Sequence, residues 1–445
     1  MIGTYIIFKE GSDVSATVGI LTLGCKVNQY ESEALAEEFA REGFTVNDPS
    51  EICDVYVINT CTVTAESDRK SRQMIRRAIA QNPNAAVLVT GCLSQVDPRG
   101  VAAIGGVHFV CGSRNKLRVV SAARKLLERR PERAVVEVGE NSANGFEKMC
   151  ITHFPRTRAY VKIEDGCESH CAYCIIPRAR GPICSKPPQE VLSEIKTLLD
   201  AGCREAVLTG IETASYGLDL ESYRLADLLC DIDRLVGDKM RIRLGSLDPS
   251  VIKRPFVERI APLRSVAPHF HLSMQSGCDA TLARMKRKYN TKMAREAVAL
   301  LREAMPDVQL TSDFICGFPG ETEADFLETA AFVDEIGFLD SHSFTYSRRA
   351  ETVAASLPDQ VPTDVARART KELIKRQKSI SERILDGQIG REYDVLFETE
   401  EKGEFKGHTP SFIEVSVSSK EDLRATVRRV RITGHKNGVA LGILI

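Results

Sequence analysis

The chain has no excess of charge of either sign, no long apolar run and no leader pattern. Its 445 residues carry 60 Lys and Arg against 61 Asp and Glu, a formal net charge of −1. Bulk charge therefore neither favours nor excludes nucleic acid, and any RNA site must be local. No apolar run reaches the roughly 18 residues of a membrane-spanning helix. The stretch Tyr5–Phe8 is too short for a signal-peptide core, so we expect a cytoplasmic protein with no membrane partner.

Cysteine is abundant by contrast, with 14 in the chain. Without a secretory signal, this number favours a reducing compartment and metal ligation over disulfides. The length predicts roughly two to four domains, and the 43% of apolar residues is ample for their cores.

Three of these cysteines, Cys167, Cys171 and Cys174, have the spacing C-x3-C-x2-C. Three thiolates this close can hold three irons of a cubane cluster, and no fourth cysteine follows at a ferredoxin-like interval. One iron would stay open, which ligand binding needs and electron transfer does not. The alternative is a zinc site, which needs four closed ligands. His170 could be the fourth, but it lies between the cysteines, where its ring would have difficulty facing the same metal.

Short apolar runs, typical of buried parallel strands, end in cysteine near the N-terminus. Three such runs end at Cys25, Cys61 and Cys92, with helical stretches between them. This alternation predicts a doubly wound parallel sheet, whose ligands gather at the carboxyl ends of the strands. The pattern alone leaves open whether these are metal ligands or ordinary buried cysteines, because a fourth run ends in Cys111.

The middle of the chain alternates six strand-like runs with amphipathic helices. This pattern predicts an open (β/α)6 partial barrel with its site at the carboxyl ends of the strands. The strand candidates are Ala159–Ile163, Ala206–Thr209, Arg241–Leu244, Phe270–Met274, Gln309–Ile315 and Ser341–Tyr346.

The C-terminal part reads as a charged helix from Thr363, which we expect to link domains, followed by short β-like runs of a small antiparallel barrel. Two basic clusters are candidates for RNA contact: Arg428, Arg429 and Arg431 in these runs, and Arg72, Arg76 and Arg77 shortly after Cys61. A solvated helix face is the usual role of such a run.

The cysteine loop, with Tyr173 as an aromatic before its last cysteine, resembles the hallmark of the radical S-adenosylmethionine (radical SAM) superfamily. Gly24-Cys25, Asn59-Thr-Cys61-Thr62 and Thr90-Gly-Cys92 resemble the N-terminal domain of methylthiotransferases. The C-terminal runs resemble a TRAM domain, an RNA-binding β-barrel. The resemblance divides the chain into an auxiliary-cluster domain (17–130), a radical SAM core (150–362), a linker helix (363–386) and a TRAM domain (387–445).

The resemblance also implies the cofactors. One [4Fe–4S] cluster on Cys167, Cys171 and Cys174 would donate an electron to S-adenosylmethionine, which yields a radical able to open the strong C–H bond at carbon 2 of adenine. A second, on Cys25, Cys61 and Cys92, would hold the sulfur that is transferred. Cofactor or substrate contacts are expected at Tyr173, Glu212, Gln275 and Asp313.

Within the family, Cys25–Glu33, Lys70–Gln73 and Gln275–Asp279 most resemble the branch that acts on tRNA threonylcarbamoyladenosine (t6A) next to the anticodon. The expected partners are that anticodon stem-loop, an electron donor such as flavodoxin or ferredoxin, and a sulfur donor. Sister branches acting on isopentenyladenosine or a ribosomal-protein aspartate resemble it less. Gly181–Ser185 is less arginine-rich than the family's usual run, and Gly210-Ile-Glu212 stands where the family usually has Gly-Ile-Asn. A one-cluster radical SAM enzyme and a non-catalytic iron–sulfur or zinc RNA-binding protein remain alternatives.

Overall fold

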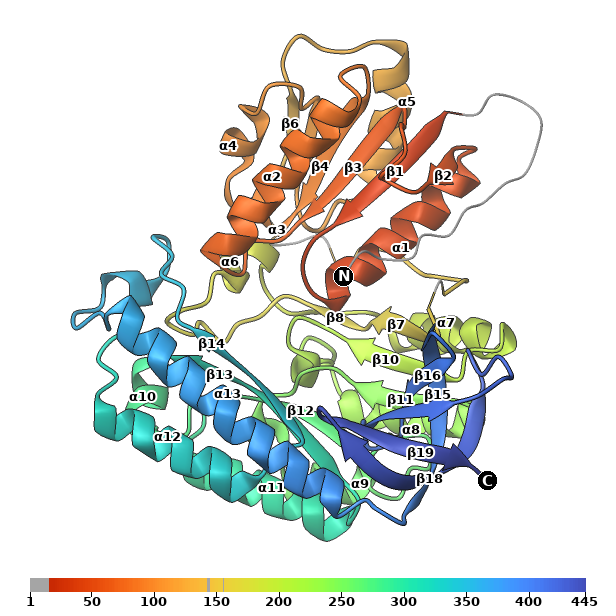
Figure 1. Ribbon diagram of the computed structural model, residues 1–445. Coiled ribbons are helices and arrows are strands. Elements are labelled where there is room, and N and C mark those ends of the chain that lie inside the picture. Colours follow the sequence, from red (N-terminus) through yellow and green to blue (C-terminus); the bar gives the residue numbers. More distant parts are fainter. Residues whose placement is uncertain (1–15, 142–144, 155) are drawn as a thin grey trace.

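A parallel sheet, a half-barrel and a small closed barrel follow one another along the chain (Figure 1). The computed structural model describes residues 16–141, 145–154 and 156–445, so the stretch Tyr5–Phe8 lies outside the described residues. Within the described ranges, no helix combines the length and apolarity needed to cross a membrane.

The N-terminal sheet has six parallel strands in the order β2-β1-β3-β4-β5-β6. The strands are β1 (Thr17–Thr22), β2 (Thr45–Asn47), β3 (Val55–Thr60), β4 (Ala86–Gly91), β5 (Phe109–Cys111) and β6 (Val135–Glu137). The helices are α1 (Lys26–Arg41), α2 (Ala65–Gln81), α3 (Cys92–Val96), α4 (Pro98–Ala102) and α5 (Arg118–Glu128).

Side chains of successive strand residues enter cores on opposite faces of this sheet. Val57 and Leu88 belong to the core that includes α1 and α5, whereas Ile58 and Val89 belong to the one that includes α2 and α4. The predicted doubly wound sheet is confirmed. Strands β2 and β6 were not predicted: each has only three residues, and neither ends in the cysteine that marked the equally short β5.

Two three-stranded parallel sheets, β11-β10-β7 and β12-β13-β14, form the central half-barrel. Isolated bridges, Ile242 to Val266 and Leu247 to Leu272, join them, and no pairing of the described strands closes the barrel between β7 and β14. The predicted six-stranded partial barrel is confirmed. Its strands are β7 (Arg158–Lys162), β10 (Glu205–Thr209), β11 (Arg241–Leu244), β12 (His269–Gln275), β13 (Gln309–Cys316) and β14 (Asp340–Thr345), with a small ribbon of β8 (Glu164–Asp165) and β9 (Cys184–Ser185).

The helices of this region are α6 (Ile176–Arg180), α7 (Pro188–Asp200), α8 (Leu225–Val236), α9 (Arg254–Ile260), α10 (Asp279–Arg284), α11 (Thr291–Ala304), α12 (Glu323–Ile336) and α13 (Thr363–Asp386). Helix α13 packs on the half-barrel: Leu373 and Ile380 enter its core, and Gln377 Nε2 donates to the Phe338 carbonyl at 2.8 Å.

The predicted C-terminal barrel is closed, in the strand order β15-β16-β17-β19-β18. Its pairings are antiparallel as predicted, except that β17 and β19 run parallel. Its strands are β15 (Glu392–Glu401), β16 (Glu404–His408), β17 (Glu414–Ser418), β18 (Val427–Lys436) and β19 (Val439–Leu444). The sequence did not reveal β16, because Glu404-Phe-Lys-Gly-His408 holds a single large apolar residue.

A buried carboxylate, Glu205 on β10, helps to hold this barrel against the central strands. Glu205 pairs with Arg243 at 2.7 Å and with Arg241 at 3.0 Å. The same arginines donate to barrel carbonyls, Arg243 to Pro410 at 3.1 Å and Arg241 to Asp394 at 3.2 Å. One carboxylate thus orients two cations that join the domains.

Candidate functional site

The three strand-end cysteines lie at the carboxyl ends of adjacent strands. Cys25 caps α1 after β1, Cys61 follows β3, and Cys92 begins α3 after β4. From β1 the chain continues to β2 on one side of the sheet, and from β3 it continues to β4 on the other side. Ligands of such sheets bind at the point where the strand order reverses in this way. The sheet topology therefore brings together the thiols of Cys25, Cys61 and Cys92, which are far apart in sequence.

The three thiols lie near enough to affect one another's ionisation. Burial raises the pKa of Cys61 to about 12, and the nearby Cys92 and Cys25 add to the rise. The surrounding protein also raises the pKa of Cys25, although its side chain keeps contact with solvent. Three mutually close thiols, one of them reachable from solvent, are a donor set that fits a cubane cluster with an open iron.

Two glycines allow this convergence. Gly91, just before Cys92, has φ +102°, and a Cβ there would lie 2.4 Å from the Thr60 carbonyl oxygen. Gly24, just before Cys25, has φ +127°, and its Cβ would lie 3.1 Å from that of Cys61. Only glycine adopts such backbone angles without strain, which explains the two Gly-Cys pairs in the sequence.

Cys111, the fourth strand-end cysteine, has different neighbours. It is fully buried at the end of β5, and burial raises its pKa to about 12. The other groups that act on it are Thr90, Lys116, Glu147 and Glu137, not the three thiols. The structure thus separates Cys111 from the other three strand-end cysteines, which the sequence pattern alone could not do.

The second set of cysteines occupies the loop between β8 and α6. Backbone N–H groups point at two sulfurs: Ser169 N lies 3.4 Å from Cys167 Sγ, and Ile176 N lies 3.4 Å from Cys174 Sγ. An Arg287 guanidinium nitrogen lies 3.3 Å from Cys171 Sγ. These donors favour thiolates, although burial outweighs them and raises the pKa of Cys167 and that of Cys174, the latter to about 12.

The zinc alternative has no geometric support. His170 is exposed and has φ +47°, in the left-handed region. Within the described ranges, no three His, Cys, Asp or Glu side chains are grouped to hold a single metal ion.

Helix α6 connects the two cysteine sets. It begins two residues after Cys174, and its preceding residue, Ile175, packs with Ala179 against Cys92 and Val96 in one buried cluster. At its other end, Arg180 Nε donates to Cys92 Sγ at 3.2 Å. Because α6 has only five residues, at about 1.5 Å each, the two sets lie close together, and Figure 1 shows α6 between the N-terminal sheet and the half-barrel.

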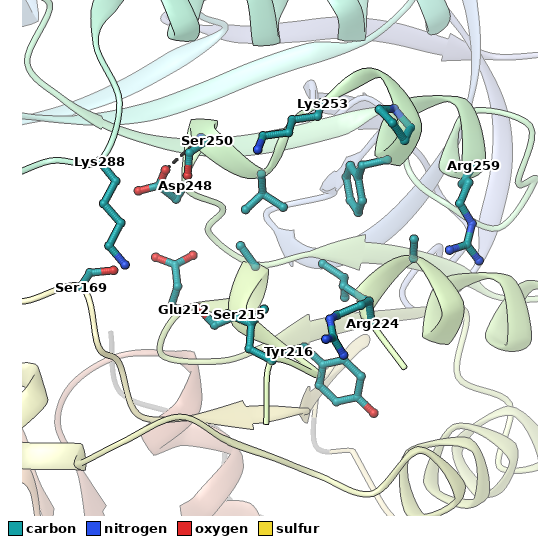
Figure 2. Close-up of a pocket in the computed structure, with 17 residues that line it drawn as sticks. Ser169, Glu212, Ser215, Tyr216, Arg224, Asp248, Ser250, Lys253, Arg259 and Lys288 are labelled. Atoms are coloured by element: carbon teal, nitrogen blue, oxygen red, sulfur yellow. Dashed lines mark hydrogen bonds between the residues drawn. The ribbon is translucent and has the colours of Figure 1, made fainter. Parts of the chain in front are cut away.

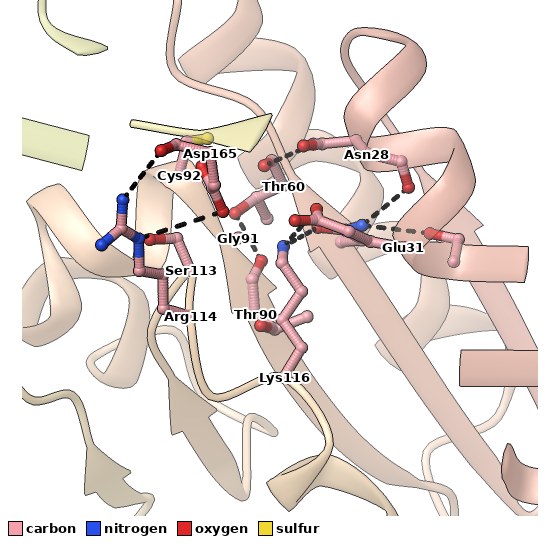
Figure 3. Close-up of polar contacts among 12 residues, drawn as sticks. Asn28, Glu31, Thr60, Thr90, Gly91, Cys92, Ser113, Arg114, Lys116 and Asp165 are labelled. Atoms are coloured by element: carbon pink, nitrogen blue, oxygen red, sulfur yellow. Dashed lines mark hydrogen bonds and ion pairs between the residues drawn. The ribbon is translucent and has the colours of Figure 1, made fainter. Parts of the chain in front are cut away.

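A buried network of charges, which the sequence did not reveal, lies beside Cys92 (Figure 3). Glu31 of α1 pairs with Arg180 at 2.6 Å, Lys162 at 2.8 Å and Lys116 at 3.0 Å. Asp165 accepts from Lys162 at 2.6 Å and from Arg180 at 3.2 Å. Although burial opposes it, the three cations hold the pKa of Glu31 well below its usual range.

A pocket of about 600 Å³ lies beside the second cysteine loop, with Ser169 of that loop and Glu212 in its lining. Figure 2 shows Glu212, Asp248 and Lys288 directed into the same space. Burial and the nearby Asp248 raise the pKa of Glu212 to about 7. Asp248 and Lys288, which also line the pocket, were not predicted as site residues.

The other three predicted contacts do not line this pocket. Tyr173 packs edge-on against Phe318 with ring centroids 6.4 Å apart. Gln275 ends β12 with φ +62°. Asp313, within β13, lies 3.3 Å from His271 and 3.4 Å from His342; burial opposes ionisation, but these histidines lower its pKa.

The two basic clusters differ in how far carboxylates neutralise them. Arg428, Arg429 and Arg431 are exposed on β18, but each has a carboxylate within 4 Å, from Glu421, Glu392 or Asp394. On α2, Arg72 pairs with Asp97 at 2.6 Å. Arg76 and Arg77 are exposed, and no ion pair to them occurs among the described residues.

Comparisons with known proteins agree with this architecture. A family model described as uncharacterized protein family UPF0004 matches residues 17–112, and the radical SAM superfamily model matches residues 161–333. A solved structure of the radical S-adenosylmethionine methyltransferase TsrM from Kitasatospora setae has TM-score 0.59 at 16% identity over 77% of each chain, which is a likeness of fold alone.

Curated relatives match most of the chain. The threonylcarbamoyladenosine tRNA methylthiotransferase MtaB of Bacillus subtilis is 39% identical over 94% of each chain, and that of Thermotoga maritima 37% identical over 86% of each. The tRNA-2-methylthio-N(6)-dimethylallyladenosine synthase of Carboxydothermus hydrogenoformans is 32% identical over 96% of this chain and 98% of its own.

The half-barrel and its cysteine loop define a radical SAM protein. With relatives at these identities over nearly its full length, the chain belongs to the methylthiotransferase family, as the motifs indicated.

Proposed function

We propose that this protein converts t6A, next to the anticodon in tRNA, into its 2-methylthio derivative. The observation that carries the proposal is the packing of Ile175, adjacent to Cys174, against Cys92, which brings the two cysteine sets close together. MtaB relatives at up to 39% identity support t6A as the substrate. The alternative substrate is a dimethylallyl-type (isopentenyl) adenosine, which relatives at 32% identity support.

Both cysteine sets fit [4Fe–4S] clusters, since each offers three thiols. When bound, the clusters would supply an electron to S-adenosylmethionine and a site for the transferred sulfur. The protein's own part is to position these groups and exclude water. We assign Cys167, Cys171 and Cys174 to the first cluster, Cys25, Cys61 and Cys92 to the second, and the pocket around Glu212 to S-adenosylmethionine.

The remaining partners follow from this chemistry. An electron donor such as flavodoxin or ferredoxin would reduce the first cluster, and a separate donor would replace the transferred sulfur. Arg76 and Arg77 are the best-placed predicted contacts to RNA phosphates, since no carboxylate of the described residues pairs with them. Such a reaction belongs in the cytoplasm, where tRNA is modified.

Nucleoside mass spectrometry of tRNA tests the proposal. Cells without the gene should keep t6A and lack 2-methylthio-t6A, and the intact gene should restore the product whereas Cys167→Ala should not. Loss of a methylthio group from isopentenyladenosine instead would favour the alternative substrate. Unchanged nucleosides in the deletion strain would contradict both.

Reconstitution without oxygen distinguishes the two-cluster enzyme from a one-cluster enzyme and from a non-catalytic RNA-binding protein. About eight irons per chain support two clusters, and about four support a one-cluster enzyme with structural N-terminal cysteines. Zinc without 5′-deoxyadenosine formation would support a non-catalytic RNA-binding protein.

A further inference from the structure

The buried network beside Cys92 carries an excess of positive charge. Its cations are Arg114, Lys116, Lys162 and Arg180, whose side chains are at most 7% exposed. The carboxylates within 4 Å of these cations, among the described residues, are Glu31 and Asp165. Glu147 and Glu164 also lie near Lys162 and burial raises the pKa of both, but neither forms an ion pair with these four cations among the described residues.

An unbalanced buried charge is costly, so such an arrangement calls for an anion. A cluster held by Cys92 would supply that negative charge next to Arg180, because Arg180 Nε donates to the Cys92 sulfur at 3.2 Å. The guanidinium cannot turn away, since Glu31 and Asp165 hold one of its terminal nitrogens and Asn28 Oδ1 accepts from the other. Arg180 is fully buried, so solvent does not weaken this field.

We propose that Arg180 is a positioning residue of the auxiliary cluster, holding Cys92 toward the cluster and raising the cluster's reduction potential. This inference rests on the proposed function, which assigns that cluster to Cys25, Cys61 and Cys92. Reduction adds negative charge to the cluster, and a fixed cation with an N–H aimed at a ligand sulfur stabilises the reduced form.

The test uses the full-length chain in which Cys167, Cys171 and Cys174 are replaced by Ala, so that only the auxiliary cluster remains. Its midpoint potential is measured by a redox titration followed by electron paramagnetic resonance, alongside iron content. Two variants are compared: Arg180→Lys keeps the charge but loses the Nε donor, and Arg180→Met loses both. Lys186→Met is the matched control, because Lys186 is also buried, pairing with Glu194, but none of its recorded contacts is to a cluster cysteine.

We expect about four irons in each protein, a potential lowered by Arg180→Lys, lowered further by Arg180→Met, and unchanged by Lys186→Met. If Arg180→Met loads no iron, the inference is tested on Arg180→Lys alone. A midpoint potential of Arg180→Lys equal to that of the triple-Ala reference protein would then overturn the inference. Failure of both Arg180 variants to load iron, with Lys186→Met loaded, would overturn it in favour of a purely structural role. Absence of a cluster from the reference protein would instead contradict the proposed function.

Discussion

At the residue scale, the buried carboxylate of Glu205 makes a large contribution to the free energy of unfolding. Its arginine partners lower its pKa from 4.5 to about 2 against the opposing effect of burial. A carboxylate whose pKa is lower in the folded state than in the unfolded state stabilises the fold. Its contribution is complete at pH values above the unfolded-state pKa and is lost as the pH falls through the folded-state pKa. The shift corresponds to about 3 kcal/mol at pH 7.

Glu205→Gln should therefore lower the free energy of unfolding at pH 7 by about 3 kcal/mol, with the difference falling to less than half at pH 3. Urea unfolding of the metal-free full-length chain at both pH values measures this. The control is Glu66→Gln, which alters an exposed pair with Arg69. A difference between wild type and Glu205→Gln that stays constant with pH would show that the pKa of Glu205 is not lowered.

The arginines of α2 differ in their freedom to bind phosphate. Replacing both Arg76 and Arg77 with Ser should weaken tRNA binding and reduce the slope of log K against log salt by about 0.7–0.9 per arginine. Arg72→Ser should have a smaller effect, because Asp97 already neutralises Arg72. The matched control is Arg234→Ser, an exposed arginine of α8. A salt slope that the double substitution leaves unaltered would exclude this face from the RNA site.

At the scale of elements, the turn from β4 into α3 depends on glycine. Gly91→Ala should destabilise the protein by about 2 kcal/mol or more, because the backbone has φ +102° and the new Cβ would meet the Thr60 carbonyl. Urea unfolding measures the change. The control is Gly105→Ala, where a Cβ meets nothing within 4 Å and no positive φ is required, so the effect should stay within about 0.5 kcal/mol. Equal effects of the two substitutions would contradict this account.

The same scale shows what the sequence could predict. Fully buried, mostly apolar strands of six residues such as β3 and β4 were predicted, and with them the convergence of Cys61 and Cys92. Helix α6 was not, because Ile176–Arg180 is only five residues long and begins with an Ile-Pro pair typical of a loop. The element that joins the two cysteine sets thus leaves no periodic signal.

At the scale of the whole molecule, the sequence-based order of a doubly wound sheet, a half-barrel and a small barrel is confirmed. The network around Arg180 could not be predicted, because its members come from distant segments and charged residues normally lie at the surface. The spacing of the cysteines in the sequence was enough to predict them as ligands, whereas the buried charges beside Cys92 are visible only in the structure.

The most direct test of the account uses oxygen-free, reconstituted protein with S-adenosylmethionine, dithionite and a t6A-bearing anticodon stem-loop, comparing wild type with Cys61→Ala. Wild type should form both 5′-deoxyadenosine and the 2-methylthio nucleoside, quantified together by mass spectrometry. Cys61→Ala should carry about half the iron and still form 5′-deoxyadenosine, but yield no methylthio product. Methylthio product from Cys61→Ala at the wild-type rate, or none from fully loaded wild type, would contradict the two-cluster account.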